Sequence, residues 1–148
     1  MVCSRQNNQG LGAIENIHFR DIDIKQVGDW GFNVNLWYWI PSYMPNSFTS
    51  EDIRKIRHIY FENIHIGKAK GNPIQILGLA EQPISDVYFR NITIKETEYD
   101  VLLRHCRNIS FDHVNIGECH WIYDDAEQIR KNKTTSPEKN VCLSISLS

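Results

Sequence analysis

The sequence predicts an all-β protein, a right-handed parallel β-helix of about four coils that belongs to a longer solenoid. Three observations lead to this expectation. The pattern apolar-x-Phe-x-(Asn/Asp/His)-apolar-x-apolar occurs four times, a further apolar strand follows each of the first three copies at a nearly constant distance, and the copies recur at solenoid spacing. An antiparallel β-sandwich would also give short alternating strands, but it would not require the same phase in every copy.

Each copy of the pattern contains a bend. Apolar residues fall at relative positions 0, +2, +5 and +7, so two alternating stretches are joined by a phase slip that a continuous strand or helix does not show. At the slip, and one residue before each copy, stand the non-glycine residues that best tolerate a left-handed backbone. We therefore expect two corners per repeat. The copies start at Ile17 (IHFRDIDI), Ile59 (IYFENIHI), Val87 (VYFRNITI) and Ile109 (ISFDHVNI), and the corner residues are Asn16, Asp21, His58, Asn63, Asp86, Asn91, Asn108 and His113.

The remaining elements follow from the same spacing. A third strand is expected 17 or 18 residues after a repeat begins, at Phe32, Ile74 and Val101. The repeats begin at Ile14, Ile56, Ile84 and Cys106, which gives periods of 42, 28 and 22 residues. We expect a polar N-terminal segment at residues 1–12, coils over residues 13–123 with an aromatic loop at 37–55, and a polar loop at 124–148 in which residues 141–147 alternate like a terminal strand.

Composition narrows the function. The chain of 148 residues is 41% hydrophobic and 23% charged, which suits a folded domain, and its net charge of -2 is scattered, so nucleic acid is not an expected partner. No apolar run reaches the about 20 residues that span a bilayer. The start lacks a secretory signal, so the chain is cytoplasmic or its true N-terminus lies elsewhere; a parent with a signal would be secreted or periplasmic. The four cysteines and six histidines are dispersed, so we expect buried thiols and neither metal nor cofactor.

Two segments carry a family resemblance. Residues Ile74 to Ile94 (IQILGLAEQPISDVYFRNITI) resemble the I-x-I-x-G-L-x-E-x-P-I-x-x-I-x-F-x-N-V-x-I run of glycoside hydrolase family 28, the polygalacturonase-like enzymes. Residues Ile56 to Ile66 are similar to the family's R-N-I-x-F-x-N-I. The resemblance spans about residues 10–117 and covers the family's C-terminal coils. It implies a pectin-type polysaccharide substrate whose glycosidic bonds are hydrolysed with inversion.

The catalytic carboxylates of the family are not found in the sequence. Inversion needs a carboxylic acid and a carboxylate base, held about 6.5–9.5 Å apart. The family supplies them from an N-T-D segment and a D-D pair, followed by G-H-G and R-I-K. This sequence has neither N-T-D nor G-H-G, and its aspartate pair, Asp124-Asp125, follows the last expected coil instead of preceding the first. We therefore assign no catalytic residue and expect the fragment alone to be inactive.

Five residues are candidates for substrate binding. Depending on the alignment, Arg5 falls at the arginine or the lysine of the R-I-K region; either could meet a uronate carboxylate, although a single arginine is more often only solvated. The stretch GFNVNLWY resembles a family segment that ends in a cleft-lining tyrosine, here Tyr38. Trp37, Trp39 and Tyr43 offer further flat faces for sugars. For Tyr38 substrate binding and loop packing are equally supported, and for the other three aromatic residues packing is favoured.

Two functions remain open. The chain is either the C-terminal part of a polygalacturonase-like hydrolase whose acid and base lie on upstream coils, or a small β-helix that binds a glycan or acts as a scaffold without catalysis. Both imply a polysaccharide partner. In either case an uncovered coil end would expose strand edges and apolar surface, so we expect self-association through that end.

Overall fold

A computed structural model describes residues 2–3, 12–36 and 54–137 of the chain. The described residues form strands and connecting turns, without a helix. Five strands are long, with 12 to 16 residues, and three are short, with two to four. The strands are β1 (Val2–Cys3), β2 (Ala13–Val27), β3 (Phe32–Asn35), β4 (Lys55–Ala69), β5 (Ile74–Leu77), β6 (Ile84–Thr97), β7 (Val101–Ile116) and β8 (Trp121–Asn132).

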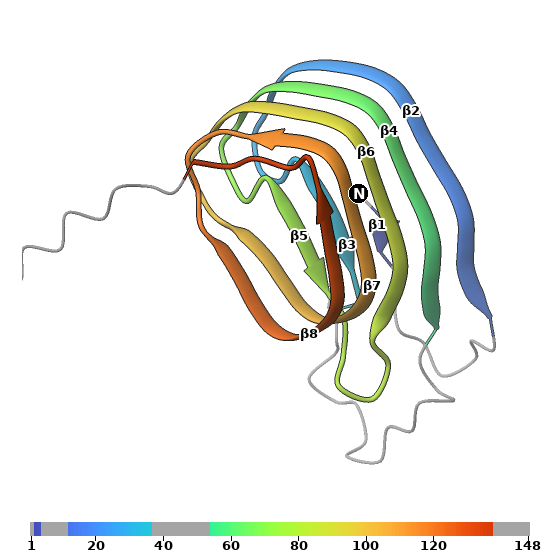
Figure 1. Cartoon of the computed structure of the whole chain (residues 1–148). Helices are drawn as coiled ribbons and strands as arrows, with labels where there is room; N and C mark the ends of the chain where they lie inside the picture. The colour runs from blue at the N-terminus through green and yellow to red at the C-terminus, as the bar shows by residue number, and fades with distance from the viewer. Residues whose placement is uncertain (1, 4–11, 37–53, 138–148) are drawn as a thin grey trace, which may run out of the picture.

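All strand pairs are parallel, and together they form one sheet in the order β1-β3-β5-β7-β6-β4-β2, with β8 paired to β7. Figure 1 shows the sheet curling round, so that the long strands lie stacked on one side and the short strands face them across the interior. The fold is therefore an all-β, curled parallel sheet of the kind that solenoids form. The all-β, parallel part of the predicted fold class is therefore confirmed, and the antiparallel sandwich is excluded.

The register reproduces the predicted repeat spacing. Ile14 pairs with Ile56 and Ile84 pairs with Cys106, so the repeat starts lie side by side. Corner side chains bonded between neighbouring strands are 42, 28, 22 and 20 residues apart in sequence. The short strands β3 and β5 are also aligned, with Phe32 opposite Ile74.

The backbone confirms all eight predicted corners. Each of these residues has a positive φ, between 52° and 59°. Their side chains also bond to one another along the sheet. Asn91 Nδ2 donates to Asn63 Oδ1 at 2.8 Å, and Asn63 Nδ2 donates to Asp21 Oδ1 at 3.0 Å. Short polar side chains thus both permit the left-handed corner and link one repeat to the next.

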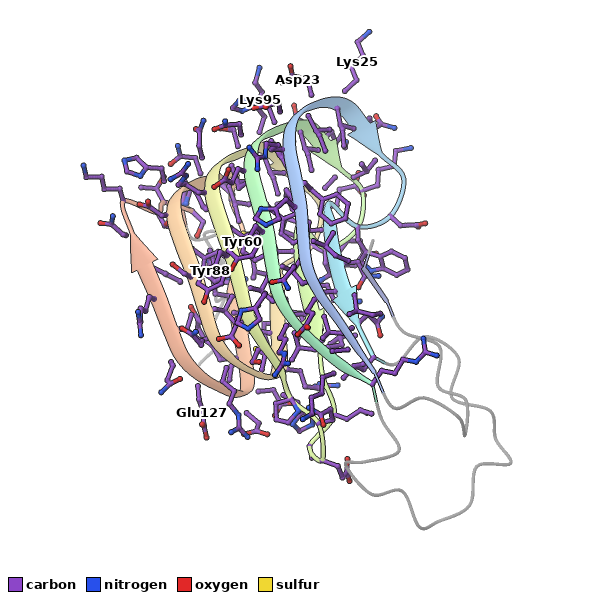
Figure 2. The ribbon with its side chains drawn as sticks, turned by 90° about the vertical axis from the view of Figure 1, so that its right-hand side faces the viewer. Asp23, Lys25, Tyr60, Tyr88, Lys95 and Glu127 are labelled. Carbon is purple, nitrogen blue, oxygen red and sulfur yellow. The ribbon has the colours of Figure 1, made fainter. Side chains whose placement is uncertain are left out.

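The core consists of the inward residues of the repeats. The pattern's Phe residues are stacked through the interior, with ring centroids 5.1 Å apart for Phe19 and Phe61, 5.0 Å for Phe61 and Phe89, and 5.0 Å for Phe89 and Phe111. Phe32 of β3 meets Phe61 and Phe89 edge-on. On the outer surface a second ladder runs from His18 to Tyr60 and Tyr88, the last two of which lie side by side in Figure 2.

At the C-terminal side the structure differs from the polar loop expected from residue 124. Strand β8 continues to Asn132 and pairs with β7 through Asp112. Its inward apolar side chains are few, and the intervening residues are charged and exposed, so the alternation is hidden in the sequence. The corners at Asp125 and Gln128 again have positive φ.

Candidate functional site

The five predicted substrate-binding residues Arg5, Trp37, Tyr38, Trp39 and Tyr43 all lie outside the described residues, as do the greater part of the aromatic loop and residues 141–147. The structure does define the element that leads to four of them. Strand β3 ends at Asn35, and Leu36, the last described residue before Trp37, is fully buried. The candidate site is therefore built on the outer face of the short strands β3, β5 and the start of β7.

Three polar side chains on this face are shielded from solvent. In β3 the apolar residues Phe32 and Val34 point into the core, so Asn33 and Asn35 point outward, and Gln75 is the register partner of Asn33 in β5. Asn33, Asn35 and Gln75 are 3%, 7% and 7% exposed, and they are the buried polar residues of the described chain. Carboxamides in such a setting need hydrogen-bond partners, because desolvating an unpaired polar group is costly.

One of these amide groups has an unused donor. Gln75 Nε2 donates to Asn33 Oδ1 at 3.4 Å, which occupies the acceptor side of Asn33. Asn33 Nδ2 is buried and has no partner among the described residues. An amide N–H in this position can donate to a hydroxyl or carboxylate oxygen. Sequence reasoning did not single out Asn33, although the alternation in FNVN already placed two asparagines on one face.

The aspartate pair lies on β8, beside the start of β7, and both carboxylates are bonded to side chains of β7. Asp124 Oδ2 accepts from Arg104 Nε at 2.7 Å, and Asp125 Oδ2 lies 2.7 Å from His105 Nδ1. Both carboxylates are about half exposed. Since each carboxylate is held by a side chain of β7, the pair fastens β8 to β7.

Cys106, the residue after His105, has a thiol that is unreactive near neutral pH. Burial, and then the charge of Asp125, raise the pKa of the Cys106 thiol to about 12. The nucleophilic thiolate is therefore suppressed near neutral pH. Cys119 is also buried, so for these two residues the expectation of buried thiols is confirmed.

The histidines are dispersed over the fold. His58 and His113 are corner residues, His18 stacks on Tyr60, and His120 lies 3.4 Å from Asp100 through Nδ1. Within residues 12–36 and 54–137, no group of three metal-ligating side chains comes together.

A second concavity lies on the outer face of the long strands. It is a shallow hollow of about 610 Å³, lined in part by Asp23, Lys25, His65, Thr93 and Lys95. Figure 2 shows Asp23, Lys25 and Lys95 projecting from the same side of the fold. Gly67 lies between Lys25 and Lys95 in register, and a side chain at its position would collide with the backbone carbonyl of Lys25. These groups are solvent-exposed, so the hollow is a charged surface and not an enclosed site.

Comparison with known proteins adds no relative: no family model, no curated protein and no solved structure matches this chain. A search of the described residues for a helix long and apolar enough to cross a membrane also found none.

Proposed function

We propose that this chain is the C-terminal part of a polygalacturonase-like glycoside hydrolase that binds pectin-type polysaccharide and belongs to an inverting enzyme. In this proposal the curled sheet is a right-handed parallel β-helix of about four coils. Right-handed crossovers are the rule for parallel strands joined in one sheet. The acid and base are supplied by coils that stack on β2 and precede it in the parent protein.

The observation that carries the binding part of the proposal is the unpartnered Asn33 amide. It is buried on the outer face of β3, next to Gln75, on the strand that leads into Trp37 and Tyr38. Buried donors with no protein partner are rare and call for an explanation. A uronate carboxylate or a sugar hydroxyl would satisfy this donor, and an aromatic ring nearby would pack against the sugar face.

The adjacent aspartates of this chain are not assigned as the catalytic acid and base, for a structural reason. The only adjacent aspartates, Asp124 and Asp125, are committed to Arg104 and His105. An inverting mechanism instead needs one carboxyl that carries a proton and one free carboxylate about 6.5–9.5 Å away. The 148-residue chain should therefore bind the polysaccharide without cleaving it.

The test is a calorimetric titration of the chain with oligogalacturonate, together with a reducing-sugar assay. Asn33→Asp keeps the oxygen that accepts from Gln75 but replaces the free donor by an acceptor, so we expect Kd to rise about 10-fold or more. Tyr38→Ala should weaken binding with little change in melting temperature. Asn115→Asp is the matched control, because Asn115 is an exposed asparagine on the long-strand face.

Two results would contradict the proposal. The first is no measurable binding of oligogalacturonate by the unaltered chain. The second is equal binding by the Asn33→Asp and Asn115→Asp variants, which would separate the ligand from the short-strand face. The catalytic part is tested separately: a parent chain extended before β2 should carry the N-T-D, D-D and G-H-G series and release reducing ends.

The second candidate function is a β-helix that binds a glycan without hydrolysing it. It is favoured by the ion pairs that hold both adjacent aspartates. Oligogalacturonate binding by the longest natural chain without release of reducing sugar would select this function over the first.

A further inference from the structure

The strand β2 leaves part of the core uncovered. Among the described residues β2 pairs only with β4, and no described strand pairs with its other edge. Its inward side chains are only partly buried, whereas their register partners in β4 are 0–5% exposed. The inward residues of β2 are Ile14, Ile17, Phe19, Ile22, Ile24 and Val27, and their partners are Ile56, Ile59, Phe61, Ile64, Ile66 and Ala69.

A hollow lies at the β2 end of the core, where no described strand packs over it. It has a volume of about 110 Å³ and is lined by Phe19, Ile22, Ile24 and Phe32 together with residues of the next repeat. Phe19 stacks on Phe61 through one ring face, at 5.1 Å. Most of the lining is apolar and belongs to the core, although Asn33 also lines the hollow, so the group that fits most of it is another layer of apolar side chains.

The spacing between the inward residues of β2 is the same in both chain directions. Their spacing from Ile14 to Val27 is 3, 2, 3, 2 and 3 residues, which is a palindrome. A palindromic strand can pair with a second copy of itself in antiparallel orientation while all inward residues stay on one face. The pairs would be Ile14 with Val27, Ile17 with Ile24, and Phe19 with Ile22.

We propose that in the 148-residue chain a second copy covers this end, through antiparallel β2–β2 pairing about a two-fold axis between Arg20 and Asp21. The outward residues then also match. Arg20 lies opposite Asp21 of the second copy, and His18 lies opposite its Asp23. The two-fold axis repeats both contacts, and no like charges face each other directly.

The pattern disfavours a slip of two residues in either direction. A slip by two residues in one direction places Ile17 opposite Gln26 and Ile22 opposite Asp21. The slip in the other direction places Phe19 opposite Arg20 and Ile24 opposite Glu15. Either slip buries charged or polar side chains against the core, which disfavours it.

The β8 end of the fold disfavours head-to-tail stacking of copies. In β8, Lys131 is the register partner of Phe111, so a lysine stands where the earlier repeats have phenylalanine. Its Nζ lies 3.6 Å from the centre of the Trp121 ring, whose Nε1 donates to Ser136. Head-to-tail stacking would press Phe19 of the next copy onto Lys131. The positive charge of Lys131 at the β8 end therefore favours a closed dimer over a filament.

This inference does not rest on the proposed function, because it concerns the association of the 148-residue chain and not its ligand. In a longer parent, preceding coils would take the place of the second copy. Failure of one idea is separable from failure of the other: mass measurements test the dimer, and oligogalacturonate titration tests the binding face.

The experiment is sedimentation velocity over a concentration series of the 148-residue chain, with folding checked by circular dichroism. We expect twice the monomer mass. His18→Glu places two carboxylates opposite each other at two symmetric points and should raise the dimer Kd about 10-fold or more. Adding Asp23→Lys restores opposite charges and should bring the dimer back. Arg130→Glu is the matched control, because Arg130 is the residue of β8 in the same outward row as His18.

Four outcomes would overturn the proposal. The first is a chain that is monomeric at every concentration. The second is a His18→Glu variant that keeps the dimer, and the third is a double variant that stays folded but does not restore it. The fourth is larger open-ended species that Arg130→Glu disrupts, which would show head-to-tail association instead of the two-fold dimer.

Discussion

Replacing Phe89 by alanine should be among the most damaging single changes to this fold. Phe89 is 1% exposed, and its ring lies 5.0 Å from Phe61, 5.0 Å from Phe111 and 5.4 Å from Phe32. Truncating a buried phenylalanine costs about 3–5 kcal/mol, and the three aromatic neighbours place this one near 5 kcal/mol. For a protein whose total stability is about 5–15 kcal/mol, much of the folding free energy is lost.

The adjacent residue Tyr88 is a matched control, because it differs mainly in the face to which it points. It is half-buried on the outer surface, stacks on Tyr60 at 5.0 Å and accepts a hydrogen bond from Asn108. Tyr88→Ala should cost about 1–1.5 kcal/mol, the scale of one exposed ring pair with a hydrogen bond.

Urea unfolding followed by circular dichroism measures both variants. With an m value of about 2 kcal/mol per molar urea, Phe89→Ala should lower the midpoint by about 2–2.5 M and Tyr88→Ala by less than about 1 M. A one-residue slip in register would exchange the two faces. Equal midpoints, or a larger loss for Tyr88→Ala, would therefore refute the assignment of inward and outward residues.

Three further predictions concern corners, pH and thiols. Asn91 has φ 52°, so Asn91→Val should melt about 2–8 °C below Asn91→Gly in calorimetry, whereas equal melting would remove the corner argument. Hydrogen bonds from His113 and Asn132 hold the pKa of Asp112 below its usual range. Its stabilising contribution is present above the ordinary carboxylate pKa and lost as pH falls through the lower folded value, so urea midpoints should fall less steeply below about pH 4 in Asp112→Asn. The Cys106 thiol, with a pKa near 12, should resist iodoacetamide at pH 8 in the folded chain and react in urea, as peptide mass mapping would show; native labelling would contradict its burial.

The sequence predicted the repeats well because each one carries its own chemical signature. Apolar spacing marks the inward residues, and Asn, Asp or His marks the corners, as at Asp21 and Asn63. The spacing also gave the strand register, since identical patterns align only in one way when every inward residue must stay in the core.

The last strand was missed for an equally physical reason. In β8 the corner residues include Gln128, a type that rarely adopts a left-handed backbone, and Lys131 replaces the repeat's phenylalanine. A terminal repeat faces solvent on one side, so its sequence follows the core pattern less closely. Local composition therefore indicates a loop where tertiary pairing with β7 makes a strand.

The candidate site was harder to predict than the fold. Sequence reasoning pointed to aromatic residues such as Tyr38, which lie outside the described residues. The unpartnered donor of Asn33 depends on two facts that the sequence does not contain: its depth of burial, and the direction of the Gln75 amide. Alternation could place Asn33 on the outer face, but only coordinates show which of its hydrogen-bonding groups is already used.

The shrinking spacing of the repeats has a consequence for folding kinetics. Bonded corner pairs are 42 residues apart between β2 and β4, but only 20 apart between β7 and β8. Closing the longer separation costs about 0.7 kcal/mol more in chain entropy, and loops with more local contacts form faster. We expect structure to start near β7 and β8 and to spread toward β2. During synthesis β7 and β8, the segments that pair most readily, are made last. The N-terminal half therefore cannot pair onto them until synthesis of the chain is nearly complete.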